Sequence, residues 1–578
     1  MTDATGPDQV TGATPDNAIR NADRADNGPV LAADGTPLKR SLNRALRREK
    51  TRALLLIAPL LLFILITFIA PIADMLFRSV ENAIVEDTLP ATVEALDEWD
   101  SATEELPSPD VFRALFFDLF VAAEAKEHTQ LGTRLNYEQT GISSTFRSTG
   151  RGLDDIGELY QDVFEDQNEL WEEADFWYAM MNAGDGAAAG DLLAAERARM
   201  AALTDEPKDG EIGFAPSATI ASILPRTTRE YTAFAILTAL VEEDVVAEEE
   251  PWEAVFAALG LDLQDQSLRA GIEGYSGPGA AELQAALANV DSLPVVDYRA
   301  AFIEEDDDWG DPEVWRTLQT YSDRYTMGYF LNSIDLQLTP DGIQSRPEDE
   351  QIYILLFQRT LIMSMAITLS CILLGYPIAF LLANLPLRTA NVLMILVLLP
   401  FWTSLLVRTS AWKVLLQQQG VINDILVWIG LVDDANRLVM INNQTGTIIA
   451  MTHILLPFMI LPLYSVMKTI PPAYVRAAKS LGATDWTAFW RVYFPNSVPG
   501  IGAGSILVFI LAIGYYITPE LVGGTTGVFI SNRIAYHISS SLNWGLAAAL
   551  GSILLAAVLI LYWTYDRIVG IDNVKLGG

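Results

Sequence analysis

Long apolar runs separated by polar segments predict membrane-spanning helices in this chain. A run of about 18 residues or more can cross a hydrocarbon core about 30 Å thick. Six runs reach this length, near 53–77, 353–384, 389–411, 446–468, 498–519 and 544–566. We therefore expect a mostly α, polytopic α-helical membrane protein with six transmembrane helices. Trp402, Thr403 and Ser404 interrupt the third run and glycines open the fifth, which suits helix contacts or a pathway better than lipid exposure.

A basic stretch precedes the first run, as it would in a secretory signal peptide. The apolar core of the run exceeds the 7–15 residues typical of such a peptide, and about 50 residues come before it. We interpret 53–77 as a retained membrane anchor, with a signal peptide as the alternative.

The segment between the first two runs differs chemically from the rest of the chain. Residues 81–350 hold 58 Asp or Glu and 15 Lys or Arg, a net charge of −43, whereas the remainder carries +7. Aromatic residues run through this acidic block, as in LWEEADFWYAMM at 170–181, so we expect it to bury a core. It shows no long polar–apolar alternation and no evident internal repeat, so we predict a mainly helical external inserted domain.

Acidic clusters such as IEEDDDWGDPE at 303–313 fit either a cation site or the solvated surface of a folded domain. The spacing of an EF-hand loop is absent there, and His128, His453 and His537 are too scattered to indicate a metal site. We favour solvation and expect no metal and no cofactor.

Basic residues predict the orientation of the spans. The flank before the first run is strongly basic, so the positive-inside rule assigns it to the cytoplasm. Its charged residues are Lys39, Arg40, Arg44, Arg47, Arg48, Lys50, Arg52 and Glu49. Six alternating crossings then place the acidic block outside and the C-terminus inside. Four basic residues run against this assignment, because they fall on outside segments: Arg408, Lys413, Arg437 and Arg533.

These features divide the chain into five parts. Residues 1–38 are predicted to be a disordered cytoplasmic arm, and 39–80 hold the basic flank and the first span. The acidic external domain covers 81–350, a five-helix core covers 351–570, and 571–578 form a cytoplasmic tail.

The stretch RAAKSLGATDWTAFWRVYFPNSVPG, residues 476–500, lies between the fourth and fifth runs. Proline is tolerated in the first turn of a helix, so Pro471 and Pro472 can start one. Gly482 can end it in a left-handed conformation.

A second helix is expected after this turn. Thr484 or Asp485 is a suitable N-cap for it, and we expect it to end at Pro495. The helix-turn-helix would lie at the cytoplasmic surface, where it either docks another protein or contacts only lipid headgroups.

The spacing in this stretch resembles the signature loop of bacterial ABC importer permeases: Glu-Ala-Ala, three residues, Gly, nine residues, then Ile-x-Leu-Pro. Ala477, Ala478, Gly482 and Pro495 match this pattern with its spacing retained, and Val492 and Phe494 are apolar replacements for the usual Ile and Leu. Arg476 stands where the family usually has the glutamate, so a polar contact of that glutamate with an ATPase must differ here or be absent. The resemblance implies that 469–497 is a cytoplasmic coupling loop.

Four further stretches resemble the spermidine/putrescine type of these permeases. They are LLGYPIAFLLAN (373–384), LPFWTSLLVRTSAW (399–412), TPELVGGTTGVFISNRI (518–534) and LNWGLAAALG (542–551). The resemblance covers the first span and about 353–570. The acidic block has no recognised counterpart and is therefore interpreted as a large external (periplasmic) insertion.

The resemblance implies the permease subunit of an ATP-driven importer in the bacterial inner membrane, with a polyamine such as spermidine or putrescine as the default cargo. Because the chain lacks a G-x-x-x-x-G-K-[ST] phosphate loop, ATP hydrolysis is expected in a separate subunit and this chain is not expected to be an enzyme. The implied partners are two ABC ATPase subunits, a second related permease, a periplasmic solute-binding protein and the lipid bilayer. No nucleic acid is expected.

Two alternatives stay open from the sequence. Related permeases carry other small organic solutes or ferric iron. A membrane-anchored external scaffold or sensor would use the spans only as an anchor, but an anchor does not need an alanine-glycine loop of this spacing.

Polar and aromatic side chains in or beside the spans form the predicted substrate path. They are Trp402, Thr403, Ser404, Arg408, Tyr515, Tyr516 and Glu520. Such groups are costly in a membrane unless they face a pathway or partner, although Trp and Tyr also anchor helices at the interface. Glu520 would pair with an ammonium group of a polyamine or cap the external end of the fifth span. We expect the insertion to contact the solute-binding protein.

Overall fold

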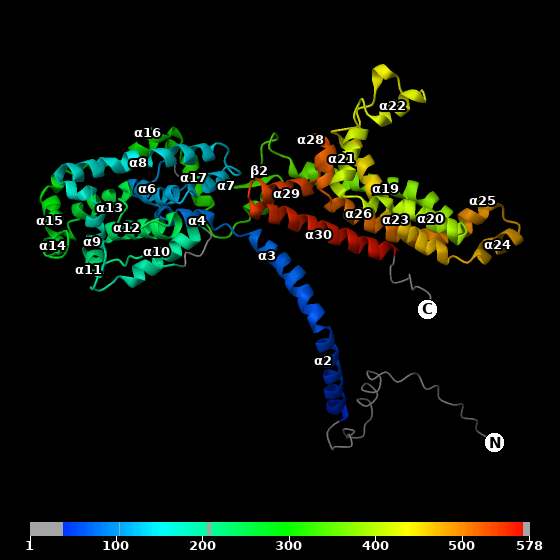
Figure 1. Cartoon of the computed structure of the whole chain (residues 1–578), viewed down its shortest axis with the longest axis horizontal. Helices are drawn as coiled ribbons and strands as arrows, with labels where there is room; N and C mark the ends of the chain where they lie inside the picture. The colour runs from blue at the N-terminus through cyan, green and yellow to red at the C-terminus, as the bar shows by residue number, and fades with distance from the viewer. Residues whose placement is uncertain (1–37, 103–104, 205–209, 570–578) are drawn as a thin grey trace. The chain divides into compact units, whose positions relative to one another are not determined.

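The computed structural model describes residues 38–102, 105–204 and 210–569 (Figure 1). The predicted disordered arm, apart from Leu38, and the predicted tail lie outside these residues. The chain divides into two units, Met1–Phe77 and Arg78–Gly578.

One long helix, basic at its start and apolar afterwards, makes up the described part of the first unit and ends at Arg78. It consists of α2 (Leu38–Ile64), the π turn η1 (Leu65–Ile69) and α3 (Ala70–Arg78), which follow one another directly. Residues 49–78 of this helix are long and apolar enough to cross a membrane. The predicted basic flank and first span are therefore parts of one continuous helix.

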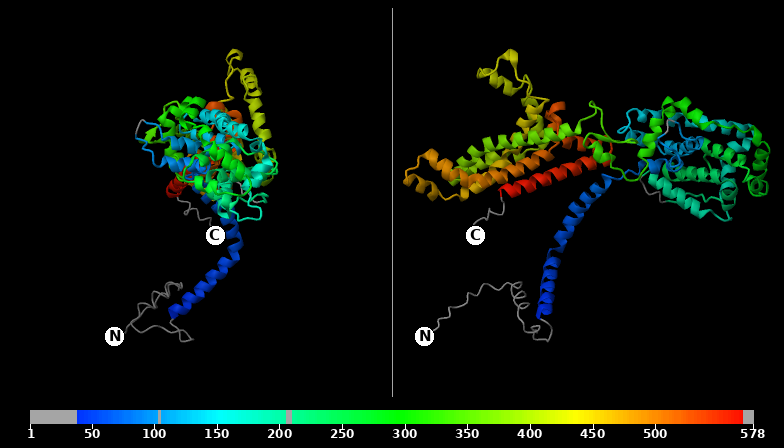
Figure 2. Two further views of the ribbon diagram at one scale, coloured as in Figure 1. Left: turned by 90° about the vertical axis from the view of Figure 1, so that its left-hand side faces the viewer. Right: turned by 180° about the vertical axis from the view of Figure 1, so that it is seen from behind.

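The second unit holds the other membrane-spanning helices, which lie side by side in Figures 1 and 2. They are α19 (Tyr353–Asn384), α23 (Gln444–Thr469), the helix Asp485–Gly514 that includes α26 (Phe494–Gly514), and α30 (Trp544–Val569). The third predicted span is bent by 95° between Leu387–Trp402, which is α20 (Leu387–Leu398) with η6 (Leu399–Trp402), and α21 (Leu405–Leu415). The described residues thus contain five spanning helices, or six if the bent pair is one span. This confirms a mostly α polytopic membrane protein.

Short helices connect the spans. They are α22 (Val421–Trp428), η7 (Asp434–Asn436), α24 (Pro472–Ser480), α27 (Ile517–Val522), α28 (Gly524–Gly527) and α29 (Ile530–Ser539). α25 (Asp485–Ala488) and η8 (Phe489–Tyr493) form the first part of the spanning helix Asp485–Gly514. In both figures α24 and α25 lie at the opposite end of the bundle from α29.

The fifth spanning helix ends at Gly514, five residues before the predicted end. Pro519 has no N–H to donate to the carbonyl of Tyr515, and Ser531 Oγ donates to that carbonyl instead, at 2.8 Å. The apolar run is longer than the helix because hydropathy does not register a missing backbone donor.

Glycines bring α26 close to α23. A Cβ at Gly504 would lie 2.6 Å from Met459 Sδ, and one at Gly500 would lie 3.0 Å from Val466 Cβ. The glycines that open the fifth run therefore serve helix contact.

The acidic module, residues 81–350, is built almost entirely from helices around one apolar core. The helices are α4 (Ile84–Thr88), α5 (Pro90–Leu96), α6 (Pro109–Glu124), α7 (His128–Leu135), α8 (Ile142–Gln167), η2 (Glu169–Glu172), α9 (Ala174–Met181), α10 (Gly190–Leu203), α11 (Ala218–Ile223), α12 (Pro225–Leu237), η3 (Thr238–Glu242), α13 (Glu253–Gln264), α14 (Arg269–Glu273), α15 (Ala280–Ala288), η4 (Val290–Ser292), α16 (Tyr298–Glu305), η5 (Asp307–Gly310), α17 (Pro312–Thr320) and α18 (Gly328–Asn332). An antiparallel hairpin follows, made of β1 (Leu336–Thr339) and β2 (Gly342–Ser345). The prediction that this segment is mainly helical and buries a core is confirmed.

The acidic module contains an internal repeat, contrary to the sequence interpretation. Tyr160, Phe164, Trp171 and Trp177 are each matched 138 residues later, by Tyr298, Phe302, Trp309 and Trp315. In both sets a short 3-10 helix precedes an α-helix, and the second Trp Nε1 donates to the carbonyl of the first, at 2.8 and 3.0 Å. We call residues 80–203 the first repeat and 215–332 the second repeat.

The starts of the repeats match as well. Thr92 on α5 donates through its N–H and Oγ1 to Asp118 on α6, at 2.7 and 2.9 Å. Thr227 on α12 donates in the same way to Asp262 on α13, at 2.9 and 2.8 Å. In each repeat a buried carboxylate thus satisfies the orphan backbone donor of a proline-initiated helix.

Each repeat completes the core of the other. The ring of Phe112 lies 4.5 Å from that of Trp315, and the equivalent Phe256 lies 5.0 Å from Trp177. Backbone hydrogen bonds also cross between the repeats in both directions. Thr326 N–H donates to the carbonyl of residue 80 at 2.8 Å, and Ala189 N–H donates to the carbonyl of residue 216 at 2.7 Å. Reciprocal contacts of this kind are those of a twofold-related pair.

One buried carboxyl group of the module lacks a counter-charge of its own. Arg199 pairs with Asp118 and Glu196, and Arg229 pairs with Glu196, so three carboxylates, including Glu230, face two guanidinium groups. Glu230 is 4% exposed, and its Oε2 has no hydrogen-bond partner within the described part of the chain. Burial raises the pKa of Glu230 to about 7, against the opposing effect of the two arginines.

Replacing Glu230 with glutamine should therefore stabilise the module at alkaline pH. The folded state holds the Glu230 proton more tightly than the unfolded state, so this group's contribution is complete below about pH 4.5 and is lost as pH rises through 7. Glu230→Gln should raise the free energy of unfolding by roughly 2 kcal/mol at pH 8 and flatten its decline between pH 5 and 8. Hydrogen exchange of α12 in the full chain measures this, with exposed Glu249→Gln as the control. Identical pH profiles for Glu230→Gln and wild type would contradict it.

Candidate functional site

The predicted coupling loop forms a helix, a tight reversal and the start of a second helix. Proline occupies the first turn of α24, and Gly482 follows the helix with φ +91°, in the left-handed region. Gly482 N–H donates to Lys479 O at 2.9 Å and Ala483 N–H to Ala478 O at 3.1 Å, the two bonds of a Schellman ending. The predicted helix stop at Gly482 is confirmed.

A second helix follows, and Thr484 is its N-cap, with Oγ1 accepting the N–H of Thr487 at 3.3 Å. The expectation that this helix ends at Pro495 is wrong, since α25, η8 and α26 form one continuous helix to Gly514. Pro495 lies in the first turn of α26, directly after the π turn, where its missing N–H is tolerated.

Charged and small residues line the accessible side of α24. Arg476 and Ala477 are exposed and Ala478 is half-buried. Lys479 pairs with Asp485, whereas Arg476 forms no ion pair within the described part of the chain. The charge of Arg476 is therefore available to a partner.

Large apolar side chains are exposed around the same helix. Leu481 is 90%, Trp486 71% and Tyr474 51% exposed. Val492 is half-buried and Pro495 is exposed. Exposed apolar groups gathered in this way mark a contact surface.

An aromatic cluster joins the second helix of the predicted coupling loop to α19. The ring of Phe380 on α19 lies 5.8 Å from Phe489 and 5.1 Å from Tyr493, both edge-on. Half-buried Phe494 lies 5.8 Å from Tyr376, also on α19. Because close-packed side chains transmit displacement, a movement of this segment should move α19.

Arg408 stabilises the bend in the third span. A break in a spanning helix leaves carbonyl groups that need another donor inside a membrane. Arg408 donates to the carbonyl of Pro400 and, at 3.1 Å, to that of Thr403, and its Nε lies 3.4 Å from Thr403 Oγ1. Ser404 is the exposed N-cap residue of α21, and Trp402 is 72% exposed.

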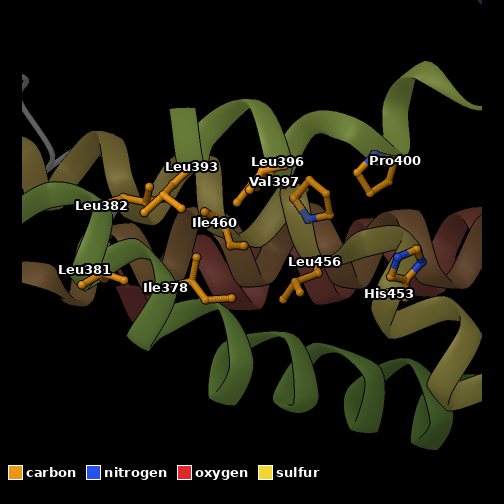
Figure 3. Close-up of a pocket in the computed structure, with 11 residues that line it drawn as sticks. Ile378, Leu381, Leu382, Leu393, Leu396, Val397, Pro400, His453, Leu456 and Ile460 are labelled. Carbon is orange, nitrogen blue, oxygen red and sulfur yellow. The ribbon is translucent and has the colours of Figure 1, made fainter. Parts of the chain in front are cut away.

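A cavity of about 410 Å³ lies beside this bend, between α19, α20 and α23 (Figure 3). Its lining is aliphatic, with Pro400 and His453 at one end. His453 Nδ1 accepts a hydrogen bond from Trp412 Nε1 at 3.0 Å, so a neutral imidazole carries its proton on Nε2. An ionisable group inside a spanning helix with a specific partner indicates a functional position.

The other predicted path residues lie just after α26. Tyr515 is half-buried and Tyr516 is 47% exposed. Glu520 lies exposed on α27, and its Oε2 accepts a hydrogen bond from Asn532 Nδ2 at 2.6 Å. The same Asn532 amide donates to the carbonyl of Tyr516 at 2.9 Å.

The predicted path residues thus fall into two groups, one at the bend of the third span and one around α27. The groups are on helices in contact, because the hydroxyl oxygens of Thr409 on α21 and Thr518 on α27 are 3.2 Å apart. Sequence reasoning missed His453, Trp412 and Asn532. The available signal was a histidine, His453, within an apolar run and a tryptophan, Trp412, beside another.

Comparison with known proteins identifies the family. The model of the family "Binding-protein-dependent transport system inner membrane component" matches residues 375–569. The spermidine/putrescine transport system permease protein PotB of Salmonella typhimurium (strain SL1344) is 34% identical over 222 residues, which cover 38% of this chain and 77% of PotB. The inner membrane ABC transporter permease protein YdcU of Escherichia coli (strain K12) is 32% identical over 235 residues, covering 39% of this chain and 74% of YdcU.

Among solved structures, a bacterial alginate ABC transporter in complex with an alginate pentasaccharide-bound periplasmic protein is 20% identical, with a TM-score of 0.32. The match covers 39% of this chain and 81% of that chain. The identity to PotB extends over more than two thirds of its length, and the family model begins after the acidic module. This chain therefore belongs to the family of binding-protein-dependent transport system inner membrane components.

Proposed function

We propose that this chain is the transmembrane permease subunit of an ATP-driven importer, and that it carries a polyamine such as spermidine or putrescine across the inner membrane. The observation that carries the proposal is the Schellman-ended helix α24 with its exposed surface, followed by a helix whose aromatic side chains on η8 and α26 pack against α19. Similarity to permease subunits supports the transport role, and similarity to PotB supports the choice of cargo.

In this proposal two ABC ATPase subunits supply the energy, one on this chain and one on a second, related permease. Ala477 and Ala478 form the low ridge against which the ATPase packs, with Arg476 at its charged edge. Closure of the ATPases on ATP moves α24, and Gly482 keeps it at a fixed angle to the following helix. The aromatic cluster passes the movement to α19, and α23 and α26 tilt with it, which gives alternating access.

The proposed orientation in the membrane is the one predicted from the basic flank before the first span. The N-terminus, α24 and the C-terminus lie in the cytoplasm, and the acidic module lies in the periplasm. A solute-binding protein delivers the cargo on the periplasmic side, in keeping with the family description.

The proposed path runs between the bend of the third span and α27. Glu520 offers a carboxylate to an ammonium group, and Trp402, Tyr515 and Tyr516 offer aromatic faces that favour cations. Arg408 is occupied by backbone carbonyls, so it shapes the path rather than binding the cargo.

Two measurements test the proposal separately. Purification of the tagged full chain from its native membrane in mild detergent should recover an ATPase that carries a phosphate loop. Mass spectrometry of the solute retained by the co-purified binding protein should identify a polyamine. Absence of any ATPase would favour the scaffold alternative, whereas a different solute would leave the transport role and overturn the cargo.

A further inference from the structure

The acidic module caps the spanning helix α19 with one carboxylate. Asp335, at the end of the module's helices, is 4% exposed and has φ +58°, which is uncommon for a residue with a side chain. Its Oδ1 accepts the N–H groups of Ile352 and Tyr353 at 3.1 and 2.9 Å, and its Oδ2 accepts that of Ile354 at 2.8 Å. The first turn of α19 thus has its orphan donors and its helix dipole satisfied by the module.

A tyrosine of the module is packed against the start of α30. Tyr329 on α18 is 5% exposed, and a Cβ added to Gly545 would lie 2.4 Å from its ring. The hydroxyl of Tyr329 accepts a hydrogen bond from Arg134 Nε at 2.8 Å, and the Arg134 guanidinium lies 4.4 Å from the ring centroid. Arg134 also pairs with Glu138 at 2.7 Å, with both side chains buried. Contacts within the module therefore fix the position of Tyr329, and its ring packs against Gly545 of α30.

A third contact joins the module to α29. His537 is 2% exposed, and its ring nitrogens lie 3.1 Å from Tyr353 Oη and 2.9 Å from Ser541 Oγ. The ring of Tyr137, from the module, meets the His537 ring edge-on at a centroid distance of 5.7 Å. The module therefore contacts the adjoining ends of α19, α29 and α30 through buried groups.

Comparison of the two repeats distinguishes residues that the fold of a repeat needs from residues that serve only these contacts with the spanning helices. Gly190 begins α10 of the first repeat as Gly328 begins α18 of the second, 138 residues later. At the same separation, Asp191 stands where the second repeat has Tyr329, whereas Asp335 lies beyond the end of the second repeat. The first repeat forms its helix with Asp191 at the position of Tyr329, so the fold of a repeat does not require a tyrosine there.

We propose that Asp335 and Tyr329 are positioning residues for transport, which fix the acidic module to α19 and α30 so that docking of a binding protein on the module moves these two helices. The inference rests on the proposed import function. Three separate contacts at the ends of three helices make the module and these helix ends one body. A force applied to the module is then delivered to α19, the helix that the aromatic cluster links to η8 and α26.

The test uses the full transporter in lipid nanodiscs with its binding protein. Gly545→Val places a side chain where the Tyr329 ring lies, and Asp335→Ala removes the cap of α19. Asp341→Ala, on the exposed turn between β1 and β2, is the matched control. ATP hydrolysis is measured without and with the binding protein, and hydrogen exchange is measured at the amides of Ile352, Tyr353 and Ile354.

Gly545→Val and Asp335→Ala should keep the basal hydrolysis rate and lower its stimulation by the binding protein at least about fivefold. Asp335→Ala should also speed exchange of the three amides, and Asp341→Ala should change neither quantity. Undiminished stimulation in both variants would overturn the proposal, as would an equal fall of basal and stimulated rates, which indicates a merely structural role. If the wild-type chain recruits no ATPase, the proposed import function itself fails. Unchanged exchange of the three amides in Asp335→Ala would refute the attachment of the module to α19 independently of that function.

Discussion

Replacing Gly482 with valine should reduce uptake at least about tenfold while the chain still inserts into the membrane. Gly482 has φ +91°, which a β-branched residue adopts only with strain, and no atom within 4 Å of its Cβ position would otherwise obstruct a side chain. The strain should open the Schellman ending and change the angle of α24, so ATPase movement would no longer reach α19. Uptake of radiolabelled spermidine into cells measures the effect, with membrane levels checked by immunoblot.

Two controls isolate this effect from general strain. Gly430→Val introduces the same left-handed strain after α22, where φ is +74° and the space around the Cβ is also open, and it should leave uptake within about twofold of wild type. Gly482→Asn should retain most uptake, because asparagine tolerates the left-handed region. Full uptake by a correctly inserted Gly482→Val variant would refute the coupling role.

Replacing Trp177 or Trp315 with alanine should destabilise the acidic module by about 3–5 kcal/mol, and by similar amounts. Both side chains are fully buried, and each packs against a phenylalanine of the other repeat, Phe256 or Phe112. Each substitution therefore leaves a large cavity where the repeats meet. Hydrogen exchange of α6 and α13 in the full chain measures the loss, and Trp428→Ala, at a side chain that is 85% exposed, is the control.

Because the contacts between the repeats are reciprocal, the two variants should lose similar amounts of stability, and comparing their losses tests whether the repeats are equivalent. If Trp177→Ala were strongly destabilising and Trp315→Ala had almost no effect, the repeats would not be equivalent partners. Protection lost only within the substituted repeat would also contradict a shared core.

The elements that could be predicted are those with a local physical cause. Apolar length gave the positions of the spanning helices, and the conformational freedom of glycine gave the end of α24 at Gly482. The continuation of the second helix through Pro495 was missed, because a π turn five residues long changes which N–H groups are needed. The rule that a helix ends at a proline, applied to the sequence, does not take a π turn into account.

The internal repeat escaped sequence reasoning because few positions carry it and their separation varies. Leu89 and Leu224 are 135 residues apart, Asp118 and Asp262 are 144 apart, and the aromatic set is 138 apart. Insertions and deletions between these positions hide a fixed period. Only the reciprocal contacts between the repeats make the correspondence evident.

The arrangement of the predicted path residues could not be predicted from the sequence, because it depends on tertiary structure. Apolar length did not indicate the 95° bend, the use of Arg408 to satisfy its carbonyls, or the contact between Thr409 on α21 and Thr518 on α27. His453 was judged by its distance from other histidines in sequence, whereas its neighbour Trp412 lies 41 residues away. The roles assigned to these residues, to Glu520 and to the coupling segment stay predictions.

The two repeats of the acidic module are tethered on one chain, which changes the concentration dependence of their pairing. A tether converts a bimolecular association into an intramolecular one at an effective concentration of millimolar order. Two separate copies of a repeat would instead have to meet at the concentration set by their expression. The paired state of this module is therefore independent of copy number, and a cell that makes only a few molecules still makes each of them complete.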